Sequence, residues 1–400
     1  MTDHAPAAPT FEGPGLFRNM TDRETLDELI RQDDARVAMK SKTLEEFSVA
    51  WVAKLTPTQG GEYYRALRPA ALASRRFDWH TVFANEVGGE VGVENGPLLA
   101  RSPNGHIMKP KVLIVRPIKE WTQQQTEQAH ANGQKVIADL DDDIWRHEDW
   151  TPETRAAASA DHFDEWFPNV DAVLVSTHHL KAMIIADGHS APVFVAPNCY
   201  DPHGLRCEPL PGRNIGTRLW LSGRMNADLG LYRSLFMPLL EELDLTFVHL
   251  GKHEQSGKPG EGTHGIDSFT KLGAPLDRLI ELPSCTIPEF PEKLGRFLSI
   301  GAIAMAEVPY NMAKTETHAI ELASMGIPLA AATTLKIYDE VPGVVEPTPE
   351  AVGARVEALL KRDYWFAESD RARTWARAVA TTNEELYLAA LAEAVAGLYA

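Results

Sequence analysis

Short apolar runs alternate with longer amphipathic stretches through most of the chain. The pattern predicts helices at 62–73 and at 122–132, where Gly133 ends the second helix. The apolar runs before residue 198 predict six strands, at 47–55, 78–84, 111–116, 135–139, 172–176 and 193–196. Strands separated by helices are typical of a parallel sheet that is covered on both faces. The first half of the chain is therefore predicted to be a doubly wound α/β domain.

Residues 198–215 interrupt this rhythm with three prolines and two glycines, which is typical of an interdomain linker. Helices are then expected at 232–243 and 315–325. The apolar runs after the linker predict a second set of strands, at 218–222, 245–250, 278–282, 300–305 and 328–332. The sequence thus predicts an N-terminal Rossmann-like domain over 21–205 and a C-terminal one over 206–345.

Both ends of the chain differ from these domains. Residues 1–20 are rich in proline, alanine and glycine and are expected to form a flexible tail, followed by a helix over 21–42. Residues 346–400 are alanine-rich, and a helical tail that packs across both domains is expected there. Because parallel sheets bind ligands beyond the carboxyl ends of their strands, the cleft between the domains is the expected ligand site.

Composition narrows the class of protein. The chain has 400 residues, too many for one ordinary core, and its 39 basic against 56 acidic residues give a net charge of −17. This excludes a general nucleic-acid binder but leaves room for a small basic pocket. The cysteines lack disulfide or metal spacing, and neither a transmembrane run nor a signal peptide is expected, so a cytoplasmic location is predicted. They are Cys199, Cys207 and Cys285.

A glycine pair, Gly60-Gly61, lies between the first predicted strand and its helix. Paired glycines at this point let the backbone approach a ligand closely, although a tight turn explains them equally well. The pair is no dinucleotide fingerprint, and the chain contains no P-loop motif. Nicotinamide chemistry and nucleotide hydrolysis are therefore disfavoured.

Four aspartates between Asp139 and Asp143 follow a predicted strand. They could bind Mg²⁺, supply a base or accept a hydrogen bond from a substrate hydroxyl, or simply cap the next helix. Asp141 and Asp142 are the candidates for an acceptor site, with Asp142 also a candidate catalytic residue. His147 follows shortly after and is either part of this site or a surface histidine.

The second domain carries two cationic candidates. Ser222-Gly223-Arg224 ends its first predicted strand, where a glycine N–H and an arginine fork suit a diphosphate, unless the arginine is simply solvated. Lys314 stands beside Thr315, which is expected to cap a helix, so charge and helix dipole together favour an anion. Glu321 lies on the same helix, where its carboxylate could bind a vicinal diol such as ribose. The alternative is an ordinary helix with random surface charge.

The run from Asn311 to Ala331, NMAKTETHAIELASMGIPLAA, resembles the donor-binding segment of GT-B glycosyltransferases, in particular the retaining group that is grouped as glycosyltransferase family 4-like. Further segments resemble that group in the same order: GGEYYRALRPAAL, DAVLVSTHHLKAMI, VFVAPNCYDP and RLWLSGR. The resemblance covers about residues 47–340. It implies a GT-B fold and transfer of a hexose from a nucleotide sugar to an acceptor hydroxyl, with retention and without a metal.

The resemblance also implies roles for individual residues. Glu321 would bind the ribose hydroxyls, while catalytic Arg224 and Lys314 would neutralise the departing diphosphate with N–H groups near Thr315. Gly60 and Gly61 would line the cleft, and the backbone around Ser284 would face the nucleobase. The complete set of expected donor-binding residues is Gly60, Gly61, Ser222, Gly223, Arg224, Ser284, Asn311, Lys314, Thr315 and Glu321. No resident cofactor is implied, since a UDP- or GDP-sugar would be a co-substrate.

Two positions depart from the group's pattern. Many retaining members carry a glutamate eight residues before the one matched by Glu321, but this chain has Ala313 there, so that contact is missing or comes from Asn311 or His318. Many also have a histidine where this chain has its aspartates. The alternatives are therefore a nucleotide-sugar epimerase of the same fold and a non-catalytic sugar-nucleotide-binding protein. The acceptor could be a small molecule, a glycan or a protein side chain.

Overall fold

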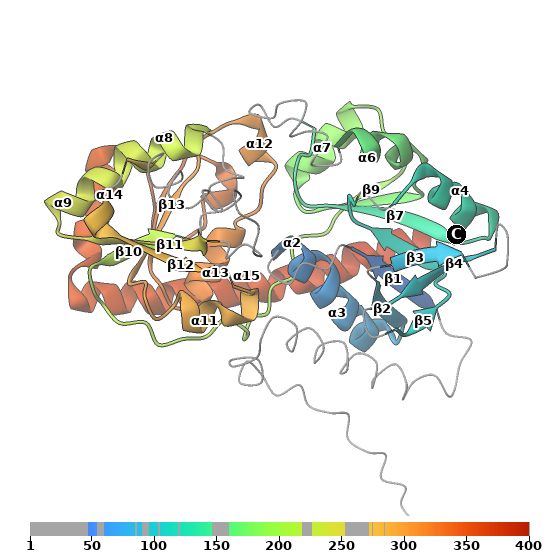
Figure 1. Ribbon diagram of the computed structural model, residues 1–400, viewed down its shortest axis with the longest axis horizontal. Coiled ribbons are helices and arrows are strands. Elements are labelled where there is room, and N and C mark those ends of the chain that lie inside the picture. The colour runs from blue at the N-terminus through green and yellow to red at the C-terminus, as the bar shows by residue number, and fades with distance from the viewer. Residues whose placement is uncertain are drawn as a thin grey trace, which may run out of the picture.

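A computed structural model describes residues 47–53, 60–84, 86–89, 96–102, 105–118, 121–145, 160–217, 226–252, 272–273, 275–283 and 285–399. Two six-stranded parallel sheets lie side by side, each with helices packed on its faces (Figure 1). The predicted pair of doubly wound α/β domains with a helical tail is confirmed. The helix expected over 21–42 lies outside the described residues.

The first sheet has the order β2-β1-β6-β7-β8-β9. Its central strands, like β6, are buried along their whole length, which is why they read as continuous apolar runs. The six strands are β1 (Ser48–Val52), β2 (His80–Ala84), β6 (Val112–Val115), β7 (Lys135–Leu140), β8 (Ala172–Val175) and β9 (Val193–Val195). All six predicted strands are present.

The helices around this sheet follow local signals in the sequence. The glycine pair begins α2 (Gly60–Glu62), which continues through the π-helical turn η1 (Tyr63–Leu67) into α3 (Arg68–Phe77). Thr122 caps α4 (Gln123–Ala131) with a capping box, and Gly133 after it has a φ of +71°, a conformation that favours glycine. The other helices around this sheet that the structure describes are α6 (Ala160–Trp166), the 3₁₀ turn η2 (Phe167–Asn169) and α7 (His178–Ala186).

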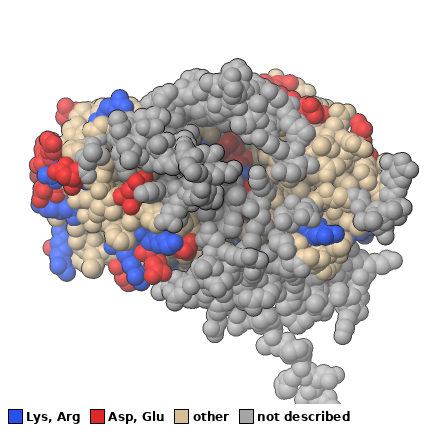
Figure 2. Space-filling view, in the orientation of Figure 1, with Lys and Arg blue, Asp and Glu red and all other residues tan. Residues whose placement is uncertain are grey.

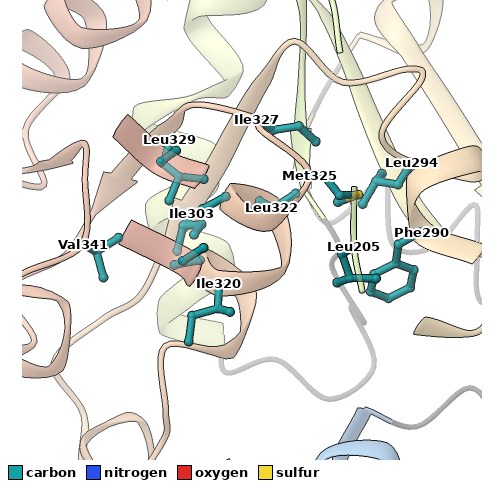
Figure 3. Packing of buried hydrophobic residues seen from close by; sticks show 14 of the residues in the cluster. Leu205, Phe290, Leu294, Ile303, Ile320, Leu322, Met325, Ile327, Leu329 and Val341 are labelled. Carbon is teal, nitrogen blue, oxygen red and sulfur yellow. The ribbon is translucent and has the colours of Figure 1, made fainter. Parts of the chain in front are cut away.

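The second sheet has the order β12-β11-β10-β13-β14-β15. Its strands are β10 (Asn214–Thr217), β11 (Thr246–Lys252), β12 (Leu279–Pro283), β13 (Ile300–Ala304), β14 (Leu329–Ala332) and β15 (Val344–Val345). The helices are α8 (Asn226–Leu235), α9 (Met237–Glu242), α11 (Phe290–Lys293), α12 (Pro309–Met312) and α13 (Thr317–Ser324), with 3₁₀ turns η4 (Leu276–Arg278), η5 (Ile287–Glu289) and η6 (Lys336–Tyr338). Apolar side chains of α13 and β14 pack together in the core beneath this sheet (Figure 3).

Several predicted boundaries in this half were wrong. The first strand, β10, begins at Asn214, inside the predicted linker. A Cβ at Gly216 would lie 1.9 Å from the carbonyl oxygen of Val248, so the close pairing of β10 with β11 requires glycine there. The helix expected over 232–243 divides near Phe236, because Pro238 lies in the first turn of α9. The strand expected at 218–222 lies outside the described residues.

Within the described ranges, four strands were not predicted. Three of them, β3 (Glu86–Gly89), β4 (Leu98–Arg101) and β5 (Ile107–Met108), form a small antiparallel sheet between β2 and β6 in the chain. They carry only two to four residues each, which is too short to show an alternating pattern. The fourth, two-residue β15, extends the second sheet beside β14.

The tail consists of α14 (Pro349–Leu359) and α15 (Arg362–Gly397). Figure 1 shows α15, in red, running from the second sheet to the first. Ala372, Ala376 and Ala380 pack in the core of the second domain, whereas Tyr387 and Leu391 pack in the core of the first. Alanines four residues apart leave a smooth face on which another element can pack closely. Within the described residues, no helix is long and apolar enough to cross a membrane.

Candidate functional site

The strand orders define a switch point in each sheet, where successive strands turn to opposite sides. In the first sheet it lies between β1 and β6, and in the second between β10 and β13. Ligands of doubly wound sheets bind beyond the carboxyl ends of the strands at this point. Gly61 follows β1 and Arg116 follows β6, so both lie at the first switch point. In Figure 2 acidic and basic atoms are visible at the bottom of a recess between the two halves.

Gly61 packs directly against an ion pair. A Cβ at this position would lie 2.9 Å from Oδ2 of Asp141 and 3.0 Å from Nη2 of Arg116. Arg116 donates from Nη2 to Oδ1 of Asp141 over 2.8 Å. The glycine is therefore needed for close approach of the helix to the Arg116–Asp141 pair. Gly60 begins the same helix.

The aspartate run divides into side chains with different partners. Asp139 is fully buried and accepts hydrogen bonds from the equally buried Arg65, and Asp143 accepts from the backbone N–H of Trp145. Asp142 pairs with Lys314, whose Nζ lies 3.0 Å from Oδ1. Nothing in the described structure shows these acids capping a helix. Within the described ranges, no cluster of three or more carboxylate, histidine or cysteine side chains is arranged to hold a metal ion.

Glu62 is a buried carboxyl group beside Arg116. Its side chain is 10% exposed, and Oε2 lies 3.7 Å from Nε of Arg116. Burial raises the pKa of Glu62 from its usual 4.5 to about 7, because Arg116 offsets only part of the desolvation. Such a group exchanges its proton near neutral pH, which is a property expected of acid–base and substrate-binding residues.

Lys314 links the two domains. It follows α12 in the second domain, reaches Asp142 of the first, and donates to the hydroxyl of Tyr310 over 3.2 Å. Burial alone would lower the pKa of Lys314, but Asp142 and Tyr310 raise it above its usual value. The ammonium group is thus charged at any ordinary pH.

The expected cap of α13 was wrong. The N-cap position belongs to Glu316, whose side chain makes no capping bond, and the helix begins at Thr317. Thr315 instead hydrogen-bonds to the hydroxyl of Thr317 over 2.6 Å and accepts from the amide of Asn198 over 3.1 Å. The threonine hydroxyl is engaged across the domain junction, which leaves the start of α13 without a side-chain cap.

Glu321 lies in the middle of α13 and is 1% exposed. The hydroxyl of Tyr64 donates to its Oε1 over 2.9 Å. Tyr64 belongs to η1, directly after the glycine pair, and its ring packs on that of Tyr200. Glu321 therefore faces the first domain from the second.

Further contacts fix the segment before α13 against the first domain. Thr177 donates to the carbonyl oxygen of Ala313, and Ala313 itself is fully buried in the core of the first domain. Tyr200 and Asn198 both hydrogen-bond to the hydroxyl of Thr317. The position eight residues before Glu321 is thus occupied by an alanine of this core.

Asn311 is fully buried within the second domain. Its amide nitrogen donates to Oδ1 of Asp228 over 2.8 Å and to the carbonyl oxygen of Ala306 over 3.0 Å. These bonds tie α12 to α8 and orient the segment that carries Lys314. Five expected site residues lie outside the described residues: His147, Ser222, Gly223, Arg224 and Ser284.

Sequence reasoning selected Asp141 and Asp142 but missed four residues of the first domain: Glu62, Tyr64, Arg65 and Arg116. Glu62 and Tyr64 follow the glycine pair within four residues, and Arg116 follows a buried strand directly. A charged side chain at the end of a parallel strand was a usable signal, since ligands gather there. No such signal marks Arg65 in the sequence, because the full burial of this arginine depends on its distant partner Asp139.

Comparisons with known proteins identify the fold. No protein-family model matches the sequence, and no curated protein does. Sucrose-phosphate synthase from Thermosynechococcus elongatus is similar in structure with a TM-score of 0.57 at 12% identity, over 88% of this chain and 99% of that one. The pneumococcal O-GlcNAc transferase GtfA, in complex with UDP and GlcNAc, gives a TM-score of 0.50 at 10% identity, over 89% and 100%. The chain has the GT-B fold, with two Rossmann-like domains facing each other and a helical C-terminal tail.

Proposed function

We propose that this protein transfers a hexose from a nucleotide sugar to an acceptor hydroxyl. One observation carries the proposal: Glu321 and Lys314 of the second domain face Tyr64 and Asp142 of the first, at the junction where a GT-B enzyme holds its donor. The complex of a similarly folded transferase with UDP and GlcNAc supports a UDP-sugar as the donor, with a GDP-sugar as the other candidate.

The chemistry follows from the charges at the junction. When the bond from the anomeric carbon to the diphosphate breaks, its electron pair leaves with the diphosphate, and the acceptor oxygen forms the new bond to that carbon. Lys314 would stabilise the leaving diphosphate together with Arg224, and Glu321 would bind the ribose hydroxyls. We assign the acceptor proton to Asp142, whose carboxylate is 39% exposed beside Lys314.

The proposal includes metal independence and retention of configuration. Metal independence is supported by the pairing of Asp139, Asp141 and Asp142 with arginine or lysine, since these cations supply the charge that a metal would otherwise bring. Retention rests on the resemblance of the segment around Glu321 to retaining enzymes. Activity that survives EDTA, and a product with the anomeric configuration of the donor by NMR, are the expected results.

The first experiment measures thermal stabilisation by UDP, GDP and their sugars, followed by donor turnover. A nucleotide at 100 times its Kd stabilises the folded protein by about 2.7 kcal/mol. Glu321→Ala and Arg224→Ala should each abolish turnover while the protein stays folded, and the exposed Lys336→Ala should not. Full activity in both site variants would overturn the assignment.

A further inference from the structure

The first switch point holds buried polar atoms that the proposed donor site does not use. In Arg116, whose side chain is 10% exposed, Nε and Nη1 have no hydrogen-bond partner among the described residues, and Nη1 lies 3.9 Å from Oδ2 of Asp139 as an ion pair. Oε2 of Glu62 is also without one, although it lies 3.7 Å from Arg116 as an ion pair. Buried donors and acceptors without partners are uncommon in folded proteins because each costs desolvation free energy. Such a concentration in one place points to a ligand that completes these bonds.

Donors and acceptors of hydrogen bonds are mixed at this point. Arg116 offers N–H donors only, whereas the carboxylate of Asp141, held by Nη2 of the same arginine, offers acceptors only. Glu62 adds a carboxyl group that gains or loses its proton near neutral pH. A hydroxyl group both donates and accepts, so a polyhydroxyl compound can satisfy both kinds of partner at once. A phosphate group that has lost its protons can satisfy the donors only.

Charge gives a second reason to favour a neutral ligand. Arg65 is paired with Asp139 and Arg116 with Asp141, so neither guanidinium carries an unbalanced charge toward the site. Lys314 is paired with Asp142 and, under the proposed function, turns to the donor diphosphate. Once Lys314 has turned to the donor, the carboxylate of Asp142 and that of Glu62 in its ionised form have no cation of their own. The acceptor side of the junction then carries an excess of negative charge, which repels an anion.

We infer that Glu62, Arg116 and Asp141 form the acceptor subsite and that this subsite takes a neutral polyhydroxyl acceptor rather than a phosphorylated one. The inference rests on the proposed function and adds to it the class of acceptor. Arg116 binds acceptor oxygens through Nε and Nη1, and Asp141 accepts from an acceptor hydroxyl. Gly61 leaves this pair in place, since any side chain there would meet both Asp141 and Arg116.

The test is a competition for the transferred sugar. The full-length protein is incubated with UDP-glucose, or with the donor that it turns over fastest, in the presence of glycerol or an equal concentration of glycerol 3-phosphate at fixed ionic strength. Product analysis then gives the fraction transferred to each compound and to water. Glycerol is expected to capture the sugar at least tenfold more often than glycerol 3-phosphate.

Variants connect this preference with the subsite. Asp141→Asn should raise the KM for glycerol at least tenfold and reduce the preference for glycerol, while the Kd of UDP changes less than twofold. Arg116→Lys, which keeps the charge but loses the guanidinium fork, should raise the same KM. The exposed Asp339→Asn serves as the matched control and should behave as the wild type.

The outcomes separate the two proposals. The acceptor subsite is overturned if glycerol 3-phosphate captures the sugar as often as glycerol or more often. It is also overturned if neither compound captures the sugar while the donor is hydrolysed. Both results leave the proposed sugar transfer standing. An unchanged KM for glycerol in both variants also overturns the acceptor subsite. Absence of both nucleotide binding and donor turnover overturns the proposed function, and the inference with it.

Discussion

The hydroxyl of Tyr64 donates a 2.9 Å hydrogen bond to Oε1 of Glu321, joining residues that are 257 positions apart in the chain. Tyr64 is 2% exposed and Glu321 is 1% exposed, so water does not replace either partner. The bond joins the glycine-pair helix of the first domain to α13 of the second. It therefore contributes both to stability and to the orientation of the carboxylate that we assign to ribose.

Removing this hydroxyl should destabilise the protein. Tyr64→Phe leaves a buried carboxylate with one donor fewer, and hydrogen bonds to charged groups contribute about 1.5–3 kcal/mol. A loss of that size in the free energy of unfolding is expected from urea denaturation. Tyr63→Phe is the matched control, because the neighbouring ring packs edge-on against Tyr64 without taking part in the bond to Glu321. A change within about 0.5 kcal/mol is expected for the control. Equal effects in both variants would contradict the assigned bond.

The two partners of the interdomain ion pair should respond in opposite directions to substitution. Lys314→Met removes a cation from the proposed diphosphate site, so the Kd of the nucleotide, UDP or GDP, should rise about 10- to 100-fold. Asp142→Asn removes the carboxylate that competes for Lys314, so the same Kd should stay equal or fall. Isothermal titration calorimetry measures both values.

Lys336→Met is the control for the lost positive charge, because this lysine is exposed in the same domain. The Kd of the nucleotide for Lys336→Met should match that for the wild type. Weaker nucleotide binding in Asp142→Asn than in Lys314→Met would show that the pair stabilises the junction instead of competing with the ligand.

The architecture was accessible from the sequence because buried parallel strands are uniformly apolar. The six strands of the first sheet could be found in this way, and Gly133 ended its helix as predicted. The three short strands between β2 and β6 could not, since two to four residues do not establish a period. The end of the linker was misplaced for a different reason. The four residues of β10 include Asn214 and Gly216 and do not form an apolar run, and Gly216 is needed for a close contact between strands.

Candidate site residues could be predicted only where the neighbouring residues in the sequence indicated a role. Lys314 precedes α13 and Glu321 lies within it, and each contacts a side chain of the first domain. Tyr64 and Arg65 could not be chosen, because their partners are set by the docking of distant elements. Thr315 shows the converse: a favourable capping residue is drawn away by Asn198 across the junction.

A side chain at Gly61 should disturb the Arg116–Asp141 pair and destabilise the protein. Gly61→Ala would place a Cβ 2.9 Å from Asp141 and 3.0 Å from Arg116, so the ion pair or the helix must shift. The matched control is Gly230→Ala in α8, where a Cβ meets nothing within 4 Å and alanine should stabilise the helix by up to about 1 kcal/mol. We expect Gly61→Ala to be about 1–2 kcal/mol less stable than the wild type in urea denaturation. A gain in stability similar to that of the control would show that the pair is not held against the glycine.

Glu62 should make stability depend on pH near neutrality. Burial raises the pKa of its carboxyl from 4.5 to about 7, so between these values the folded protein keeps a proton that the unfolded chain releases. The contribution of Glu62 is therefore most favourable at low pH and is lost as the pH rises toward 7. The charged groups that face it are Arg116, which opposes the shift, and Asp141 and Asp139, which add to it.

Glu62→Gln cannot ionise, so its free energy of unfolding should lack this component. Relative to the wild type, the variant should gain up to about 3 kcal/mol between pH 5 and pH 8, since one pKa unit corresponds to about 1.4 kcal/mol. Urea denaturation at several pH values measures the difference, and the exposed Glu340→Gln should follow the wild type throughout. If the wild type and Glu62→Gln lose stability in parallel as the pH rises, the proton is not held by Glu62. A variant that instead becomes less stable with rising pH would show that the ionised carboxylate is needed by Arg116.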